Sequence, residues 1–178
     1  LIFVLHRDTG KPFFPIEERT VPTNGVPGEI LSPTQPFPVL PPPLVKQSIE
    51  PNDAWGFTPF DKRKCREQIE LSRYGEIYTP PSLEGTTMLP SISGGSNWGG
   101  GAFDPVQNIL ITNVMSVPGF IKIIPQEELG PESFKNPLAG LPIGPPGPIK
   151  GTQYAIERYP LLSPLKVPCT RPPWGKLV

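Results

Sequence analysis

Apolar residues fall in short runs along the whole chain, and each run is closed by proline, glycine, aspartate or asparagine. The first run, residues 1–5, is rich in β-formers, and the Asp, Thr, Gly and Pro within residues 6–12 favour a chain reversal. Residues 13–18 are then expected to return as the second strand of a hairpin, with Pro15 ending it or confining it to a sheet edge. This pattern predicts short strands from the very start of the sequence.

Four more segments show strand-like composition with turn chemistry between them. The breaks include the Asp104-Pro105 turn and the small residues around Ser116, Val117 and Pro118. A further strand is expected to begin in the last residues, 174–178. The predicted strands of the middle region are residues 76–78, 86–89, 108–114 and 119–124.

One segment has helical rather than strand periodicity. Cys65 and Ile69 share a face at i, i+4, and Leu71 and Tyr74 broaden that face. The pattern predicts one short helix over residues 62–74. Asp61 is expected to be its N-cap, with Phe60 and Cys65 in hydrophobic-staple positions.

Proline dominates residues 21–51, where it fixes φ and removes backbone donors, so we expect a long extended loop there. Residues 41–43 suggest local polyproline II, which leaves two interpretations open. The segment either binds an aromatic groove of a partner or lies as a rigid strap over its own fold, which Phe37, Leu40, Leu44 and Val45 favour. Residues 125–150 form a second predicted loop, and the expected class is all-β with long Pro-rich loops.

Composition supports a folded chain. Proline and glycine are abundant, at 29 and 18 of 178 residues, but three Trp, four Tyr and nine Phe provide apolar material for a core. The formal net charge is zero, and the basic run at residues 62–64 is interleaved with Asp61 and Glu67, which argues against a nucleic-acid partner. No run is long enough to span a bilayer, and no signal peptide is recognisable. Because both ends resemble interrupted strands, residues 1–178 are expected to be a single fragment of a larger domain.

The candidate chemistry is sparse. Cys65 and Cys169 have no metal-ligand spacing, so they form either one disulfide or two separate buried thiols. His6 is the sole imidazole and follows a strand, and we assign it no catalytic role. Asp104 is expected to start an Asp-Pro turn. No Ser-His-Asp set, carboxylate pair or metal cluster can be assembled, so no catalytic or metal-binding residue is predicted.

A glycine-framed run is the strongest candidate site. Gly94 and Gly95 precede Ser96-Asn97-Trp98, and Gly99, Gly100 and Gly101 follow. Bare backbone allows close approach, an indole offers stacking area, and an Asn amide can bond to carbonyl or carboxylate groups of a planar ligand. The alternative is a glycine bulge beside a core tryptophan. The run matches neither a phosphate loop nor a dinucleotide fingerprint.

Segments spread in order over nearly the whole chain resemble the membrane-linked quinoprotein dehydrogenases. These are the glucose and quinate dehydrogenases that depend on pyrroloquinoline quinone (PQQ). The segments that carry the resemblance are residues 2–5 with Arg7 and 9–10, residues 32–37, 53–56, 60–61 with 65–66, 73–74, 78–82, 94–100 with 104–105, and 168–169 with 173–175.

The resemblance implies part of an eight-bladed β-propeller that oxidises a sugar or polyol with PQQ and a divalent cation such as calcium or magnesium. It implies a periplasmic location on a parent anchored in the inner membrane, with electrons passing to ubiquinone. It also implies that Asn97 and Trp98 contact PQQ. The family's catalytic aspartate and quinone-binding lysine find no match here, so the fragment alone is expected to be inactive.

Two further expectations complete the sequence-based picture. Severed blades would expose sheet edges and apolar sheet faces, so the fragment is expected either to pair with a second copy or to be unstable in solution. The alternative function is a non-enzymatic, propeller-like module that binds partners through its Pro-rich loops. His6 departs from the Asp or Asn that family members more often carry at its position.

Overall fold

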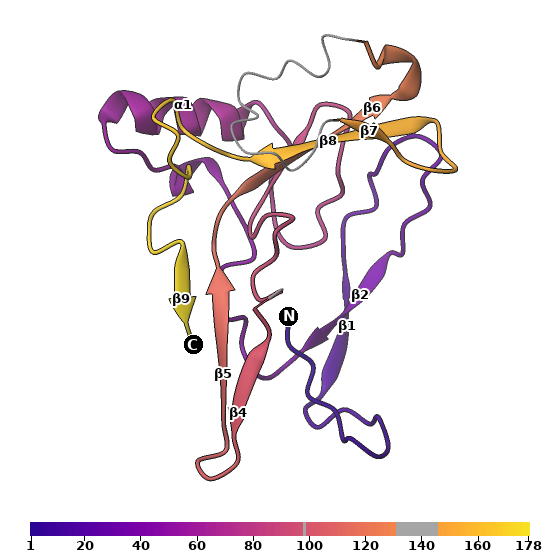
Figure 1. Ribbon diagram of the computed structural model, residues 1–178. Coiled ribbons are helices and arrows are strands. Elements are labelled where there is room, and N and C mark those ends of the chain that lie inside the picture. Colours follow the sequence, from indigo (N-terminus) through magenta and orange to yellow (C-terminus); the bar gives the residue numbers. More distant parts are fainter. Residues whose placement is uncertain (98, 131–145) are drawn as a thin grey trace.

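Three separate β-sheets and one α-helix make up the computed structural model, which describes residues 1–97, 99–130 and 146–178. A two-stranded antiparallel sheet pairs β1 (Ile16–Thr20) with β2 (Thr34–Pro38). A four-stranded sheet has the order β3-β6-β8-β7, and a three-stranded sheet has the order β4-β5-β9. Figure 1 shows the four-stranded sheet lying across one end of the molecule, with the β4–β5 hairpin projecting away from it.

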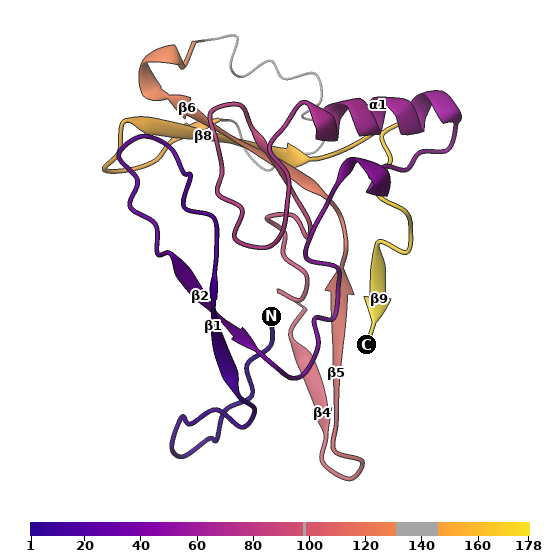
Figure 2. The same ribbon diagram turned by 180° about the vertical axis from the view of Figure 1, so that it is seen from behind.

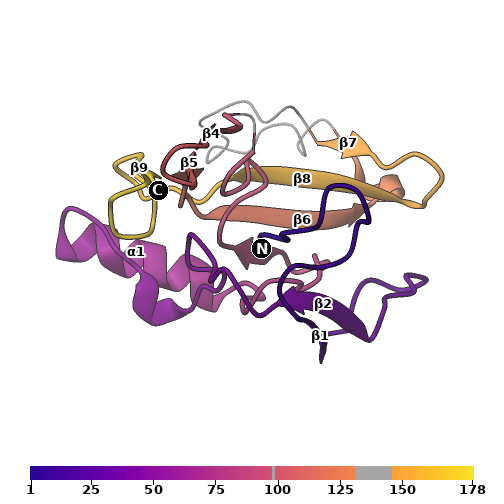
Figure 3. The same cartoon turned by 90° about the horizontal axis from the view of Figure 1, so that it is seen from below.

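The four-stranded sheet is built on a long pairing of β6 (Gly119–Pro125) with β8 (Tyr154–Pro160). Their antiparallel register runs from Gly119 opposite Pro160 to Pro125 opposite Tyr154. The short strands β3 (Thr86–Met88) and β7 (Gly147–Pro148) form its edges. Seen from below, β6 and β8 lie side by side across the molecule (Figure 3).

The three-stranded sheet pairs β5 (Ile109–Met115) with β4 (Gly101–Asp104) on one side and β9 (Gly175–Leu177) on the other. Asp104 closes the β4–β5 turn, since its Oδ1 accepts from the backbone N–H groups of Val106 at 2.8 Å and Gln107 at 3.2 Å. The expected Asp-Pro turn is confirmed. The expected strand in residues 174–178 is also present as β9.

Helix α1 (Pro59–Glu70) packs at the end of the four-stranded sheet, and short 3-10 turns lie at η1 (Pro51–Asp53) and η2 (Gln126–Glu128). The view from behind shows α1 close to the loop that leads into β9 (Figure 2). The buried cluster between these elements contains Ile49, Ala54, Cys65, Ile69, Leu89, Leu161 and Cys169, with Phe120 packed against it.

The predicted helix was placed too late in the sequence. It begins at Pro59 instead of Lys62 and ends before Tyr74, and its N-cap is Thr58, whose Oγ1 accepts from the Asp61 N–H at 3.1 Å. Proline suits the first helical turn because the N–H it lacks would have no partner there. Phe60 is 54% exposed, so the expected staple is absent as well.

Several strand predictions were wrong. Residues 1–5 contribute only an isolated bridge, from Leu5 to Pro12, and the expected returning strand instead continues as β1 and pairs with β2. Residues 76–78 form no strand, because Tyr78 has a φ of 70°, which is incompatible with an extended chain. Strands β3, β5 and β6 match the sequence-based predictions, whereas β2, β4, β7 and β8 were not predicted.

The Pro-rich strap lies on its own fold. β2 is an edge strand despite Pro36 and Pro38, as expected for proline in a sheet. Phe37 packs edge-on against Tyr78 with ring centroids 5.7 Å apart, and the Arg19 guanidinium lies 5.0 Å from the Phe37 ring centre. The contacts of Phe37 agree with the interpretation of the loop as a strap over its own fold. Residues 131–145 of the second predicted loop lie outside the described residues.

Candidate functional site

The glycine-framed run lies beside the three-stranded sheet, where β4 and β5 leave the body of the molecule. The backbone N–H of Met115 donates to the Gly95 carbonyl at 2.6 Å, which ties the start of the run to β5. Ser96 Oγ and Thr112 Oγ1 lie 2.7 Å apart, and Thr112 Oγ1 also donates to the Gly100 carbonyl at 2.9 Å. Thr112 therefore holds both ends of the loop that presents Asn97.

Asn97 is exposed within this loop. Its backbone carbonyl accepts from Gly100 N–H at 3.4 Å, while its side-chain amide has no hydrogen-bond partner among the described residues. Two donors and an acceptor are thus available to a ligand. Trp98, the second predicted contact, lies outside the described residues.

Two of the glycines have structural reasons to be glycine. A Cβ on Gly99 would lie 2.1 Å from Asn113 Oδ1, so the Asn113 amide occupies the space that a side chain there would need. Gly100 has a φ of +60°, and a Cβ on it would meet nothing within 4 Å. The backbone of Gly100 therefore borders open space, which is the close-approach surface that the composition suggested.

Asn113 was not singled out from the sequence. It is exposed on β5 directly beside Gly99, and its amide likewise has no hydrogen-bond partner among the described residues. The sequence feature that could have identified Asn113 is its polar amide within the otherwise apolar run of β5. Asn97 and Asn113 together flank the bare backbone of Gly99 and Gly100.

The site holds no acid or base. Residues 94–101 contain no ionisable side chain, and among the described residues no three His, Cys, Asp or Glu side chains are grouped to hold a metal ion. His6 lies elsewhere and is exposed. Its ring packs beside that of Phe13, with ring centroids 5.3 Å apart. The run can therefore bind and orient a ligand through amide and backbone groups, but it has no group to transfer a proton.

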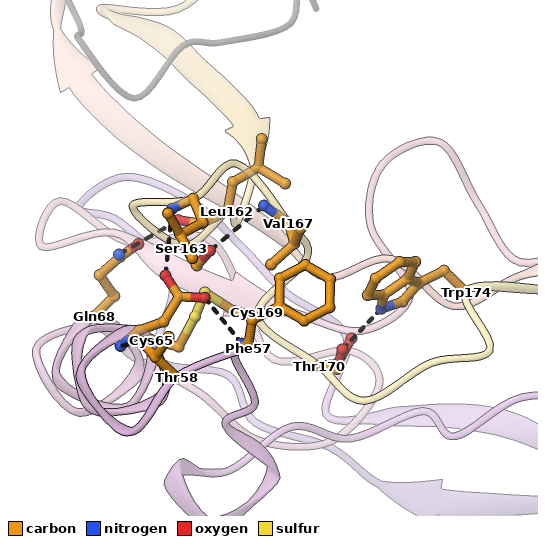
Figure 4. Close-up of a disulfide and its surroundings, with 12 residues drawn as sticks. Phe57, Thr58, Cys65, Gln68, Leu162, Ser163, Val167, Cys169, Thr170 and Trp174 are labelled. Carbon is orange, nitrogen blue, oxygen red and sulfur yellow. Dashed lines mark hydrogen bonds between the residues drawn. A yellow bond between two sulfur atoms is a disulfide. The ribbon is translucent and has the colours of Figure 1, made fainter.

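The two cysteines form a disulfide and are not separate buried thiols. Cys65 and Cys169 are bonded, with an S–S distance of 2.04 Å, and both are fully buried. Figure 4 shows the bridge between α1 and the segment that carries Leu162, Ser163 and Val167. It joins positions 104 residues apart and fixes the helix to the chain leading into β9.

A cavity of about 790 Å³ lies away from the glycine-framed run, between residues 26–29, Pro81, Ile123 and the turn at 149–154. Its polar groups are used within the fold. Tyr154 Oη donates to the Pro27 carbonyl at 2.8 Å, and Glu29 Oε2 accepts from the Val26 N–H at 3.2 Å. The cavity therefore offers fewer free polar groups to a ligand than the exposed amides beside Gly99.

Short antiparallel strands in several small sheets, joined by long loops, are typical of an all-β domain. A family model described as "Glucose/ethanol/alcohol dehydrogenase, beta-propeller domain", the PQQ family, matches residues 1–178. The chain belongs to this family of PQQ-dependent, or quinoprotein, β-propeller dehydrogenase domains. The all-β prediction and the resemblance to quinoprotein dehydrogenases are confirmed. The sheets described here are open.

Individual relatives agree with the family. A quinate/shikimate dehydrogenase (quinone) from Acinetobacter baylyi and a quinoprotein glucose dehydrogenase from Escherichia coli are each 36% identical, over 98% of this chain. A glycerol dehydrogenase large subunit from Gluconobacter thailandicus is 34% identical, also over 98% of this chain. The chain spans only 22% of the first two relatives and 25% of the third. No solved structure gives a significant match.

Within the part of the chain that the structure describes, no helix is long and apolar enough to cross a membrane.

Proposed function

We propose that this chain forms one wall of the PQQ site in a dehydrogenase that oxidises a sugar or polyol. The observation that carries the proposal is the exposed Asn97 amide, which has no hydrogen-bond partner among the described residues. It lies between Ser96 and Gly100, which both bond to Thr112, and beside the open backbone at Gly100. The names of the relatives, which act on quinate, glucose and glycerol, support a hydroxylated substrate. Bound PQQ would supply the two-electron acceptor for oxidation of the alcohol.

The residues present fit such a group on one side. PQQ is planar and carries carboxylate and carbonyl oxygens, which amide N–H groups can bind. Asn97 would donate to these oxygens, and the Trp98 indole would offer stacking area. Because residues 94–101 hold no acid or base, proton transfer belongs to groups outside this run.

The family resemblance implies further properties of the longer protein that contains this chain. The parent would be an eight-bladed propeller on the periplasmic side of the inner membrane, would use a divalent cation such as calcium or magnesium, and would pass electrons to ubiquinone. A buried disulfide supports an oxidising compartment, because such bonds form and persist there. Without the catalytic aspartate and the quinone-binding lysine, the chain alone would be inactive.

The test uses the longer protein that contains this chain, supplied with PQQ, calcium and an artificial electron acceptor. We expect an aldose or cyclitol to be oxidised, and Asn97→Ala to raise the PQQ concentration for half-maximal activity by about tenfold, since a ligand hydrogen bond is lost. Asn24→Ala, an exposed asparagine in the loop before β2, is the matched control and should leave it unchanged.

Two outcomes would contradict the proposal. Failure to oxidise any member of a panel of aldoses, polyols and cyclitols would refute the dehydrogenase and favour a binding module built on the Pro-rich loops. Equal PQQ dependence in Asn97→Ala and the parent protein would remove Asn97 from the site while leaving the activity in place.

A further inference from the structure

One buried hydroxyl on β5 meets the glycine-framed run at two points. Thr112 Oγ1 lies 2.7 Å from Ser96 Oγ and 2.9 Å from the carbonyl oxygen of Gly100. Thr112 is only 6% exposed, so both contacts are shielded from bulk water. Ser96 directly precedes Asn97 in the sequence, and Gly100 follows it. A single side chain therefore fixes the run before and after the amide that is proposed to bind PQQ.

The number of hydroxyl protons sets the direction of both hydrogen bonds. Each hydroxyl carries one proton, and a carbonyl oxygen can only accept. Thr112 donates its proton to the Gly100 carbonyl, which lies closer than the other carbonyl within reach, that of Asn113 at 3.4 Å. Ser96 must then donate to Thr112. Removal of the Thr112 hydroxyl would therefore break both hydrogen bonds at once.

Thr112 is itself held within the three-stranded sheet. Its backbone N–H donates to the Val178 carbonyl at 2.8 Å, and the Val178 N–H donates to the Thr112 carbonyl at 2.9 Å. Further along β5, the Met115 N–H donates to the Gly95 carbonyl at 2.6 Å. Groups held by strands are placed more precisely than groups on free loops. The run thus takes its position from β5.

The Asn97 side chain also packs against bare backbone within the run. A Cβ on Gly94 would lie 3.0 Å from Asn97 Cβ and 3.4 Å from Asn97 Nδ2, so the Asn97 side chain lies against Gly94. The Asn97 carbonyl accepts from the Gly100 N–H at 3.4 Å. These contacts orient Asn97 and leave its side-chain amide without a hydrogen-bond partner among the described residues. Such a group is oriented before its ligand arrives, which lowers the entropy cost of binding.

We propose that Thr112 is a positioning residue that holds the run in the conformation that binds PQQ. The inference rests on the proposed function, because Thr112 acts through Asn97. A ligand binds more weakly in proportion to the fraction of protein that is in the binding-competent conformation. Loss of both Thr112 hydrogen bonds would release the run from β5 on both sides of Asn97 and lower that fraction.

The test uses the longer protein that contains this chain, prepared without PQQ and titrated with PQQ by calorimetry in the presence of calcium. Thr112→Val should raise the dissociation constant for PQQ by about tenfold, which corresponds to a competent fraction lowered to about a tenth. Valine keeps the β-branched shape and lacks only the hydroxyl. Thr112→Ser keeps the hydroxyl and should restore the constant to within about twofold.

Thr87→Val is the matched control. Thr87 is 1% exposed, and its Oγ1 lies 2.7 Å from Ser72 Oγ, so this variant loses a buried hydroxyl–hydroxyl bond of the same length on β3. It should be destabilised in urea, as Thr112→Val is, and should still bind PQQ with the affinity of the unaltered protein. A purely structural role of the Thr112 hydroxyl would make the two valine variants alike.

Hydrogen-exchange mass spectrometry without PQQ gives a readout that is independent of activity. Peptides that cover residues 94–101 should exchange faster in Thr112→Val than in the unaltered protein, and should be unchanged in Thr87→Val. Ser96→Ala breaks only one of the two bonds and should raise the dissociation constant by about threefold. It keeps the inference testable if Thr112→Val fails to fold, which circular dichroism would show.

The outcomes separate this inference from the proposed function. Unchanged PQQ binding in Asn97→Ala would overturn both the proposed contact and the role of Thr112. Weaker binding in Asn97→Ala with normal binding in Thr112→Val would overturn the role of Thr112 alone. Equal weakening by Thr87→Val, or no recovery in Thr112→Ser, would also overturn it, since the effect would then come from lost stability and not from the hydroxyl.

Discussion

Asp61 is completely buried, and a carboxylate in that position must have hydrogen-bond donors around it. Its Oδ2 accepts from the Phe57 N–H at 3.2 Å, and its Oδ1 accepts from the Leu165 N–H at 3.3 Å. The residue that the sequence suggested as a helix cap therefore connects three segments, the loop before α1, the helix itself and the chain after β8. The cap is the preceding threonine.

Replacing Asp61 should be costly. Asp61→Ala would leave two backbone N–H groups without their acceptor, and we expect a loss of about 2–4 kcal/mol in the free energy of unfolding. Asp8→Ala, an exposed aspartate in the first turn, should change it by less than about 0.5 kcal/mol. Urea denaturation followed by circular dichroism measures both, and equal effects would show that the buried hydrogen bonds contribute little.

Glu67 provides a pH-dependent contact on the exposed side of α1. The hydrogen bond from Lys64, at 2.7 Å, holds the pKa of the Glu67 carboxyl below its usual value, and the charges of Lys64 and Arg63 add to this. A depressed pKa in the folded state means that the contact stabilises at neutral pH and is lost as pH falls through that pKa.

We expect an NMR titration to place the Glu67 pKa below that of an unpaired glutamate, and Lys64→Met to move it upward. Glu84, whose pKa is lowered chiefly by a hydrogen bond from its own backbone N–H, serves as an internal reference that Lys64→Met should not change. An unaltered Glu67 pKa in Lys64→Met would contradict the assigned cause.

At the scale of elements, the start of α1 shows how a local signal can be misplaced. Both Thr58 and Asp61 are residue types that cap helices, and the sequence offered Pro59 as a break between them. Proline is in fact favoured in the first turn, so Thr58-Pro59 is the stronger signal. The error moved the predicted helix three residues along the chain.

Thr58→Ala should lower the free energy of unfolding by about 1 kcal/mol, because the Asp61 N–H loses its side-chain acceptor. Thr23→Ala, on the exposed loop before β2, is the control of the same residue type and should have little effect. If the two variants lose the same stability in urea, the cap assignment is wrong.

Strands were predictable where apolar residues were dense. β5 and β6 are rich in β-branched residues, which favour strands. β8 was missed because Glu157, Arg158 and Pro160 dilute its pattern, and its strand conformation depends on pairing with β6. β2 was missed because two prolines are tolerated only at an edge, and no local pattern identifies which strand will be an edge.

At the scale of the whole molecule, the Cys65–Cys169 disulfide connects α1 to the segment leading into β9 within the buried cluster. A link across a separation of 104 residues restricts the unfolded chain strongly. Replacing both cysteines with serine should therefore lower the free energy of unfolding by up to about 4.7 kcal/mol in the entropic description.

The measurement is urea denaturation of the oxidised chain and of the double variant, with the oxidised chain in dithiothreitol as a second comparison. The reduced chain and the double variant should lose stability to a similar degree. A loss below about 1 kcal/mol in both would show that the packing of Ile49, Ile69 and Leu161 holds these elements without the bridge.

The sequence by itself determined the class, the family and the position of the candidate site. Short apolar runs between proline and glycine indicate strands whatever their partners, and the family resemblance rests on ordered motifs that need no coordinates. The glycine-framed run was likewise recognisable, because glycine and a flanking amide carry their chemistry locally. The proposed contact of Asn97 with PQQ still awaits its experiment.

Tertiary structure decided everything that depends on residues distant in sequence. The disulfide spans 104 residues, Asp61 bonds to a backbone group at position 165, and Asn113 lies beside Gly99 only because β4 pairs with β5. Sequence periodicity reports the surroundings of a residue along its own strand or helix. It carries no information on whether two distant cysteines meet, or on which apolar face of a sheet stays exposed.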